Sequence, residues 1–179
     1  MEPQYTLFGF VAILILYAVI GVLAAAGTVF IVRENLGPRG EQVFYGLFLV
    51  LIAAFYLAFV AYFGNPEAWQ VETAAVVVFA LIGLFGMRVP AALIVGYPLH
   101  GLWDVVHEVH AHVAWSLFEP GQLTAVPLAY GVFCAAFDVC IAAYAHTRRA
   151  EWNEAWAAPP QEPQEPQEPQ DRQEPTLSP

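Results

Sequence analysis

Hydrophobic residues form five runs along the chain, separated by short stretches that hold the charged and turn-forming residues. The runs cover residues 7–32, 43–63, 71–87, 89–109 and 123–145. Each has roughly 17–26 residues, enough for a helix that rises about 1.5 Å per residue to cross about 30 Å of hydrocarbon. A backbone in lipid must satisfy its own hydrogen bonds, and the runs lack the period-two alternation of a membrane barrel. The pattern therefore predicts an all-α integral membrane protein, with a bundle of about five transmembrane helices over residues 1–149.

Composition supports this class and excludes two others. Of the 179 residues, 59% are hydrophobic and 12% are charged, whereas an ordinary soluble domain has about 25% charged residues. Six basic residues face 16 acidic ones, for a formal charge of −10. Because binding of phosphates requires a basic surface, nucleic acid is not an expected partner. The expected partner is the lipid bilayer.

Residues 150–179 differ from the rest of the chain. They contain a repeated Gln-Glu-Pro triplet, and they hold seven acidic residues but only one basic residue, Arg172. A segment with so little to bury cannot offset the entropy lost on ordering. We expect a disordered acidic tail rich in Pro, Gln and Glu that takes no part in the fold.

The arginines predict how the bundle is oriented. Arg33 and Arg39 lie between the first and second runs, Arg88 lies between the third and fourth, and Arg148 and Arg149 follow the fifth. With five spans, all of these fall on one side of the membrane. The N-terminus and the loops on the other side, residues 64–70 and 111–122, contain no basic residue. The positive-inside rule then places the N-terminus outside the cell membrane and the C-terminal tail in the cytoplasm.

Polar residues interrupt the fourth run in a regular pattern. Four of the five histidines fall between residues 100 and 112. At about 100° per residue, a helix places His100, Asp104, His107 and His110 on one stripe, while Glu108 and His112 drift away from it. Ionisable groups in lipid are costly, usually face the interior of a bundle and mark functional sites.

The fifth run adds Asp138, which follows Cys134 by one helical turn. Counted from the cytoplasmic helix ends, His100 and Asp138 lie at similar depths. We therefore expect a polar line with His100 and Asp138 in the bundle and His107, His110 and Glu72 nearer its outer face. The candidate catalytic residues are His100, Asp104, His107 and Asp138.

Two of these motifs resemble those of a known family. The string His100-x-x-Trp103-Asp104-x-x-His107 and the helix motif Cys134-x-x-x-Asp138 are similar to motifs of small bacterial integral membrane proteins, the domain of unknown function 6010 family. Arg39 and the segment 44–46 resemble that family too, and the likeness covers most of residues 7–147. A second histidine often follows the residue matching His107, whereas this chain has Glu108. The resemblance implies a multi-helix membrane fold and supplies no activity.

The first functional hypothesis is a transition-metal site for Zn or Fe. Its expected ligands are His107, His110 and Asp104, and three further residues offer suitable nitrogen or oxygen atoms: Glu108, His112 and Glu72. Three protein ligands and an open position would suffice for metal-assisted catalysis. The sequence leaves open whether the protein is an enzyme.

Two alternatives use the same residues. In the first, the polar line serves transport, proton relay or small-molecule binding; because five spans are few for a transporter, this role would favour a homo-oligomer. In the second, the histidines and acids only hydrogen-bond neighbouring helices together, at about 0.6 kcal/mol for each bond.

Overall fold

The chain forms a bundle of long helices, seen in a computed structural model that describes residues 6–112 and 117–158. The elements are α1 (Leu7–Asn35), α2 (Pro38–Phe63), the short 3₁₀ helix η1 (Pro66–Ala68), α3 (Trp69–Gly86), α4 (Pro90–His112) and α5 (Tyr130–Ala157). No strand occurs among the described residues. The all-helical class predicted from the sequence is confirmed, while most of the predicted tail, from residue 159 onward, lies outside the described part of the chain.

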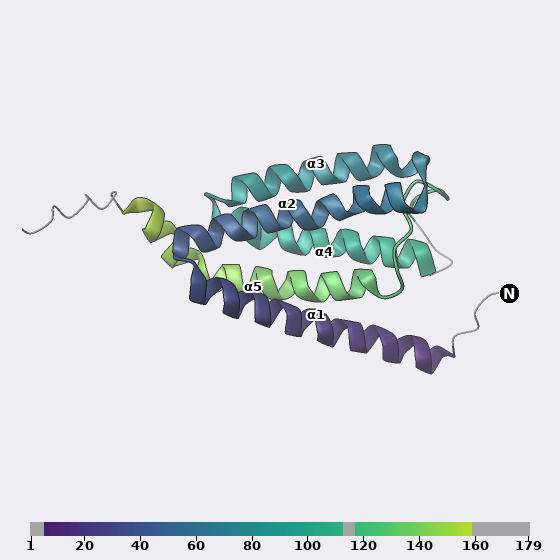
Figure 1. Cartoon of the computed structure of the whole chain (residues 1–179), viewed down its shortest axis with the longest axis horizontal. Coiled ribbons are helices and arrows are strands. Elements are labelled where there is room, and N and C mark those ends of the chain that lie inside the picture. Colours follow the sequence, from purple (N-terminus) through teal and green to yellow (C-terminus); the bar gives the residue numbers. More distant parts are fainter. Residues whose placement is uncertain (1–5, 113–116, 159–179) are drawn as a thin grey trace, which may run out of the picture.

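The five long helices lie side by side (Figure 1). The main packing pairs are α4 with α5, α2 with α3, and α1 with α5. As a result, α1 forms one edge of the bundle and α3 the opposite edge, with α4 between α5 and α3 (Figure 1). The segments that carry the polar motifs, α4 and α5, are therefore direct neighbours.

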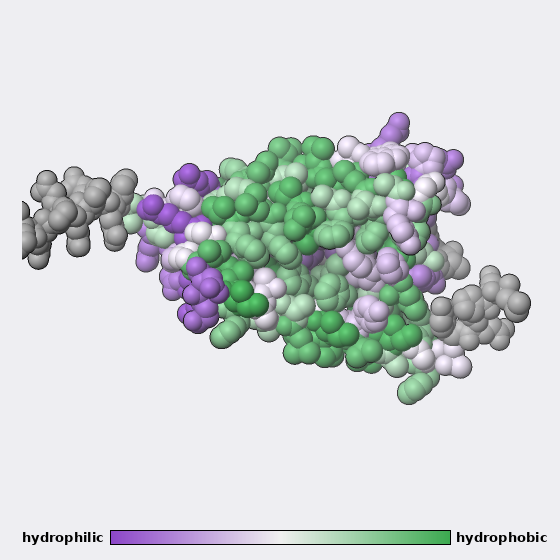
Figure 2. Space-filling model, in the orientation of Figure 1, coloured by the Kyte–Doolittle hydropathy of each residue, from purple (hydrophilic) through white to green (hydrophobic). Residues whose placement is uncertain are grey.

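Within residues 6–112 and 117–158, four stretches are long and apolar enough to cross a membrane: α1, α2, η1 with α3 (Pro66–Gly86), and α5. Figure 2 shows the corresponding surface, with apolar residues over the middle of the bundle and most of the polar residues at its two ends. Among the residues of α1, only Gly21, Ala25 and Val32 are buried. Large apolar side chains exposed along such helices are typical of a surface that contacts lipid.

Helix α4 has a similar length but a different composition. It is not among the four apolar stretches, and its buried residues include His100, Asp104, His107 and Glu108. The polar side chains face neighbouring helices, because each is at most 6% exposed. His100, Asp104 and His107 therefore point into the bundle, as the helical stripe predicts, whereas Glu108 is buried although it lies off that stripe.

Two glycines let α4 and α5 approach closely. A Cβ atom at Gly101 would lie 3.2 Å from Cα of Ala135, and one at Gly131 would collide with the backbone carbonyl of Asp104. Small residues at such positions are the usual means of close packing between membrane helices. The close approach brings the polar side chains of α4 within reach of Asp138 on α5.

The fifth helix is shifted toward the C-terminus relative to its predicted span of 123–145. It begins at Tyr130, since Pro127 and the left-handed Ala129 (φ 63°) precede it. It continues to Ala157, eight residues into the segment that the sequence predicts as the tail. The physical reason is tertiary packing, because Trp152 is fully buried and its Nε1–H donates to Oε2 of Glu41 at 2.8 Å.

The buried carboxylate of Glu41 organises this end of the bundle. Besides the bond from Trp152, it accepts hydrogen bonds from the Tyr144 hydroxyl and from the Arg148 guanidinium. Arg39 of α2 donates to the carbonyls of Ala155 and Ala158. These contacts extend α2 and α5 beyond the apolar runs, which is why both helices are longer at this end than hydropathy predicts.

Candidate functional site

A group of fully buried polar side chains lies between α2, α4 and α5. Nδ1 of His100 lies 2.8 Å from Oδ2 of Asp138 and 3.1 Å from Oδ2 of Asp104. The hydroxyl of Tyr56, on α2, donates a hydrogen bond to Oδ1 of Asp104. These four residues, here called the central cluster, are each at most 1% exposed.

The central cluster is incompletely satisfied. Among the described residues, His100 Nε2, Asp104 Oδ2 and Asp138 Oδ1 have no hydrogen-bond partner. A neutral imidazole has a single N–H group, so Nδ1 of His100 can serve only one of the two carboxylates that face it. Buried polar groups in proteins normally have partners, and each exception calls for an explanation.

The charges of the cluster are also unbalanced. Two carboxylates face one imidazole, so even a protonated His100 would leave one negative charge in the bundle. The arginines Arg39 and Arg88 lie near the other end of α2 and α4, where both contact the ring of Trp156. A buried carboxylate needs a proton or a cation beside it. An additional cation beside the two carboxylates would therefore balance the negative charge of the cluster.

His107 and Glu72 form a separate pair. The His107 Nδ1–H donates to the carbonyl of Trp103 at 3.0 Å, and Nε2 lies 2.8 Å from Oε1 of Glu72. The same Glu72 oxygen accepts the backbone N–H of Thr124 at 2.9 Å. Since Nδ1 must donate to a carbonyl, one further proton has to lie between Nε2 and Glu72. Both ring nitrogens of His107 are therefore engaged by the protein.

Tyr56 connects this pair to the central cluster. Its ring lies 4.3 Å from the ring of His107, measured between centroids, while its hydroxyl reaches Asp104. The polar groups thus continue from Asp138 and His100 toward the end of the bundle where Glu72 lies. Of the predicted polar line of His100, Asp138, His107, His110 and Glu72, the structure brings His100 to Asp138 and His107 to Glu72.

Glu108 holds the start of α5. Its two carboxylate oxygens accept the backbone N–H groups of Ala129 at 2.8 Å and Gly131 at 3.1 Å. A carboxylate in this position satisfies free N–H groups and interacts favourably with the helix dipole. His112 Nε2 lies 3.7 Å from the same carboxylate. Glu108 and His112 thus meet at the α4–α5 connection.

The structure therefore divides the predicted ligands into different groups. Asp104 lies with His100 and Asp138, not with His107; His107 lies with Glu72; and Glu108 lies with His112. His110 is half-buried at the end of α4. In the part of the chain that the structure describes, the group whose ligand atoms come together is His100, Asp104 and Asp138, all within 4.8 Å of one another. The role of each residue in metal binding or catalysis stays a prediction.

Tyr56 was not predicted as part of the site. It lies in the apolar run 43–63 together with Tyr45 and Tyr62, and nothing in the neighbouring sequence shows which of these tyrosines has a hydroxyl at the site. Tyr56 is 1% exposed and Tyr62 is 82% exposed. Tyr45 is buried as well, so only the packing of α2 against α4 shows that the Tyr56 hydroxyl is the one that reaches Asp104.

Comparison with known proteins places this site within a family. The model for the family of unknown function DUF6010 matches residues 15–151, most of the chain. The chain belongs to this family. The match includes every residue of the central cluster and the His107–Glu72 pair, and it confirms the resemblance seen in the sequence motifs. No curated protein and no solved structure matches the chain.

Proposed function

We propose that this DUF6010 protein is a polytopic membrane protein that binds one divalent transition-metal ion at His100, Asp104 and Asp138. The observation that carries the proposal is the convergence of three potential ligand atoms, within 4.8 Å of one another, from two packed helices. Imidazole nitrogen and carboxylate oxygen together suit Zn or Fe.

Charge balance supports a metal at this position. A divalent ion beside a neutral His100 and two ionised carboxylates gives a neutral group, which is the inexpensive state inside an apolar bundle. The same ion would engage atoms that otherwise have poor partners, such as Oδ2 of Asp104. The two Oδ2 atoms near Nδ1 of His100 are already placed for a shared ion.

Three protein ligands leave coordination positions for water or a small ligand group. Tyr56 contacts the cluster through Oδ1 of Asp104 and would fix the orientation of that carboxylate. Partners of this kind position the ligands of a metal and tune its affinity. Tyr56 is therefore proposed as a positioning residue.

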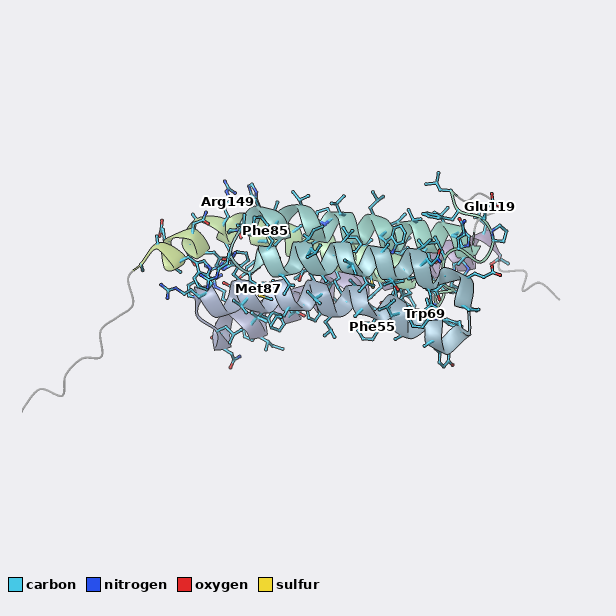
Figure 3. All side chains as sticks on the ribbon, turned by 90° about the horizontal axis from the view of Figure 1, so that it is seen from above. Phe55, Trp69, Phe85, Met87, Glu119 and Arg149 are labelled. Atoms are coloured by element: carbon cyan, nitrogen blue, oxygen red, sulfur yellow. The ribbon has the colours of Figure 1, made fainter. Side chains whose placement is uncertain are left out.

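The membrane arrangement proposed is five spans, with α4 as the fourth, in the cell membrane. The arginine-rich end contains Arg39 and Arg88 against Trp156, and Arg148 with Glu41. Figure 3 places Arg149 at this end and Glu119 at the other. By the positive-inside rule, the Arg149 end faces the cytoplasm and the N-terminus faces outward.

The test is metal analysis of the full chain purified in detergent without chelators. We expect about one equivalent of Zn or Fe in the unmodified protein, and a loss of most of it in His100→Ala and Asp138→Asn. His146→Ala is the matched control, because His146 is an exposed histidine of α5 outside the central cluster. Its metal content should equal that of the unmodified protein.

A different outcome would separate the alternatives. Less than about a tenth of an equivalent in the unmodified protein, after growth with added Zn and Fe, contradicts the proposal. If His100→Ala then only lowers the unfolding temperature, the cluster serves to join helices. Thermal unfolding of each variant, monitored by tryptophan fluorescence, distinguishes a folded variant that has lost its metal from one that has lost its fold.

A further inference from the structure

Two arginines contact one tryptophan ring at the end of the bundle where α2 and α4 begin. The guanidinium carbon of Arg88 lies 3.9 Å from the centroid of the Trp156 ring, and that of Arg39 lies 5.3 Å from it. Both distances are within the range of about 6 Å in which an aromatic ring attracts a cation. Because both carbons lie close to one centroid, the two positive charges are near neighbours.

A buried amide holds the Trp156 ring in place. Its Nε1–H donates to Oε1 of Gln42 at 3.0 Å, and Nε2 of Gln42 donates to the carbonyl of Gly86 at 2.7 Å. Gln42 itself is fully buried. The ring of Trp156 is thus tied to α2 and to the end of α3, and it fixes the position of the guanidinium groups that lie against it.

Neither guanidinium forms an ion pair within residues 6–112 and 117–158. Arg39 donates through Nε and Nη2 to two backbone carbonyls at the end of α5, and in these same residues its Nη1 has no partner. Arg88 contacts the Trp156 ring and makes no hydrogen bond with any described residue. The two arginines therefore carry positive charge that no described acidic side chain balances.

Arg88 lies where the apolar surface of the bundle ends. It is exposed, it lies between α3 and α4, and the nearby apolar side chain of Phe85 is 62% exposed. Figure 3 places Phe85 toward the same end of the bundle as Arg149. Since η1 with α3 has the length and composition of a membrane span, an exposed side chain directly after it meets the lipid headgroups.

Phosphate is the group that suits this pair of arginines. The planar N–H groups of a guanidinium match two oxygens of a phosphate, and basic residues beside a membrane span attract anionic lipids. A zwitterionic lipid carries a cation next to its phosphate, and a second arginine repels that cation. Two unbalanced arginines therefore favour a phospholipid with a net negative charge.

We propose that Arg39 and Arg88, positioned by the Trp156 ring, bind the phosphate group of an anionic phospholipid. The site lies outside the central cluster and does not depend on a bound metal. Acidic residues between positions 162 and 174 of the chain are the competing source of negative charge. The apolar surface beside Arg88 favours a lipid over that segment, which has no large apolar side chain.

The test is native mass spectrometry of the full chain in detergent, with equal amounts of phosphatidylglycerol and phosphatidylcholine that have the same acyl chains. We expect the unmodified protein to retain phosphatidylglycerol in preference, and Arg88→Gln to retain about fivefold less of it. Equal retention of the two lipids by the unmodified protein would overturn the proposal.

Arg149→Gln is the matched control for Arg88→Gln. It removes the same charge at the same end of the bundle, and the Arg149 guanidinium donates to the carbonyl of His146 in its own helix. The control should retain as much phosphatidylglycerol as the unmodified protein. Equal losses in the two variants would overturn the proposal, because the lipid would then respond only to the total charge.

A second variant tests the ring. Trp156→Leu keeps every charge but removes the surface on which the guanidinium groups lie, and it should weaken the retention of phosphatidylglycerol. If it lowers the amount of folded protein, Arg88→Lys takes its place, because lysine keeps the charge but lacks the planar group. Undiminished retention in a folded variant of either kind would overturn the proposal.

A third variant tests the acidic segment as the occupant. It replaces five carboxylates of the full chain by amides, at Glu162, Glu165, Glu168, Asp171 and Glu174. We expect phosphatidylglycerol to be retained both with and without these carboxylates. Retention that occurs only after their replacement would show that the acidic segment occupies the arginines, and it would overturn the proposal.

Discussion

Nδ1 of His100 lies 2.8 Å from Oδ2 of Asp138, and this contact joins α4 to α5 inside the bundle. Asp104, one helical turn after His100, approaches the same nitrogen at 3.1 Å. Three ionisable side chains therefore meet where close approach of the two helices excludes water. The predictions below test which residues belong to this group and which only support the bundle.

His107→Ala should leave the metal content unchanged. Both ring nitrogens of His107 contact protein groups, Trp103 and Glu72, and neither faces the central cluster. The variant should instead lower stability by about 1–3 kcal/mol, since Glu72 loses a buried partner. Metal analysis and thermal unfolding check both parts. If His107→Ala loses its metal while His100→Ala keeps it, the metal site lies at the outer histidines and the proposed site is wrong.

Glu108→Ala should destabilise the protein without removing metal. The carboxylate caps α5 through the N–H groups of Ala129 and Gly131, and loss of a helix cap costs about 0.5–2 kcal/mol. Glu119→Ala is the control, because Glu119 is an exposed acid in the connection between α4 and α5. Denaturation curves should separate the two variants; equal curves would show that the cap contributes nothing.

Gly21→Ala should weaken the packing of α1 on α5. A Cβ atom at Gly21 would collide with the carbonyl of Phe133, whereas one at Gly27, six residues later in the same helix, meets nothing within 4 Å. We expect a loss of about 1–3 kcal/mol for Gly21→Ala, as for other overpacked sites. Gly27→Ala should be neutral within about 0.5 kcal/mol. Thermal unfolding in detergent measures both, and similar effects at the two positions would contradict the packing.

A chain that ends at Ala158 should fold as stably as the full chain, and one that ends at Ala150 should not. The shorter chain lacks Trp152, which is fully buried and donates to Glu41. Removing a buried tryptophan costs about 3–5 kcal/mol. Unfolding temperatures of the two shortened chains provide the measurement. Equal stability would mean that the last turns of α5 are dispensable.

The two ends of the bundle should be accessible from opposite sides of the membrane. Single cysteines are introduced as Glu119→Cys and Arg149→Cys in a chain whose Cys134 and Cys140 are replaced by alanine. A membrane-impermeant maleimide should label the first in intact cells and the second only after permeabilisation, because the arginine-rich end faces the cytoplasm. The reverse pattern would invert the proposed orientation.

The sequence alone determined the class of fold, because membrane helices must satisfy their backbone within each segment and need a minimum apolar length. It also determined which face of α4 turns inward, since His100, Asp104 and His107 repeat at helical spacing. Local spacing could not decide where α5 ends, because the apolar run stops near residue 145 while Trp152 is held by Glu41, more than 100 residues away in sequence.

Tertiary structure alone decided which of the polar groups Asp104 joins. The sequence favoured Asp104 with His107 and His110, which lie near it on one stripe of one helix. The structure instead places Asp104 with His100 and Asp138 and against Tyr56 of α2. Helical spacing fixes the direction in which a side chain points, whereas its partner depends on which neighbouring helix lies at that depth. That depth is set by contacts far apart in the chain, such as the close approach at Gly101 and Gly131.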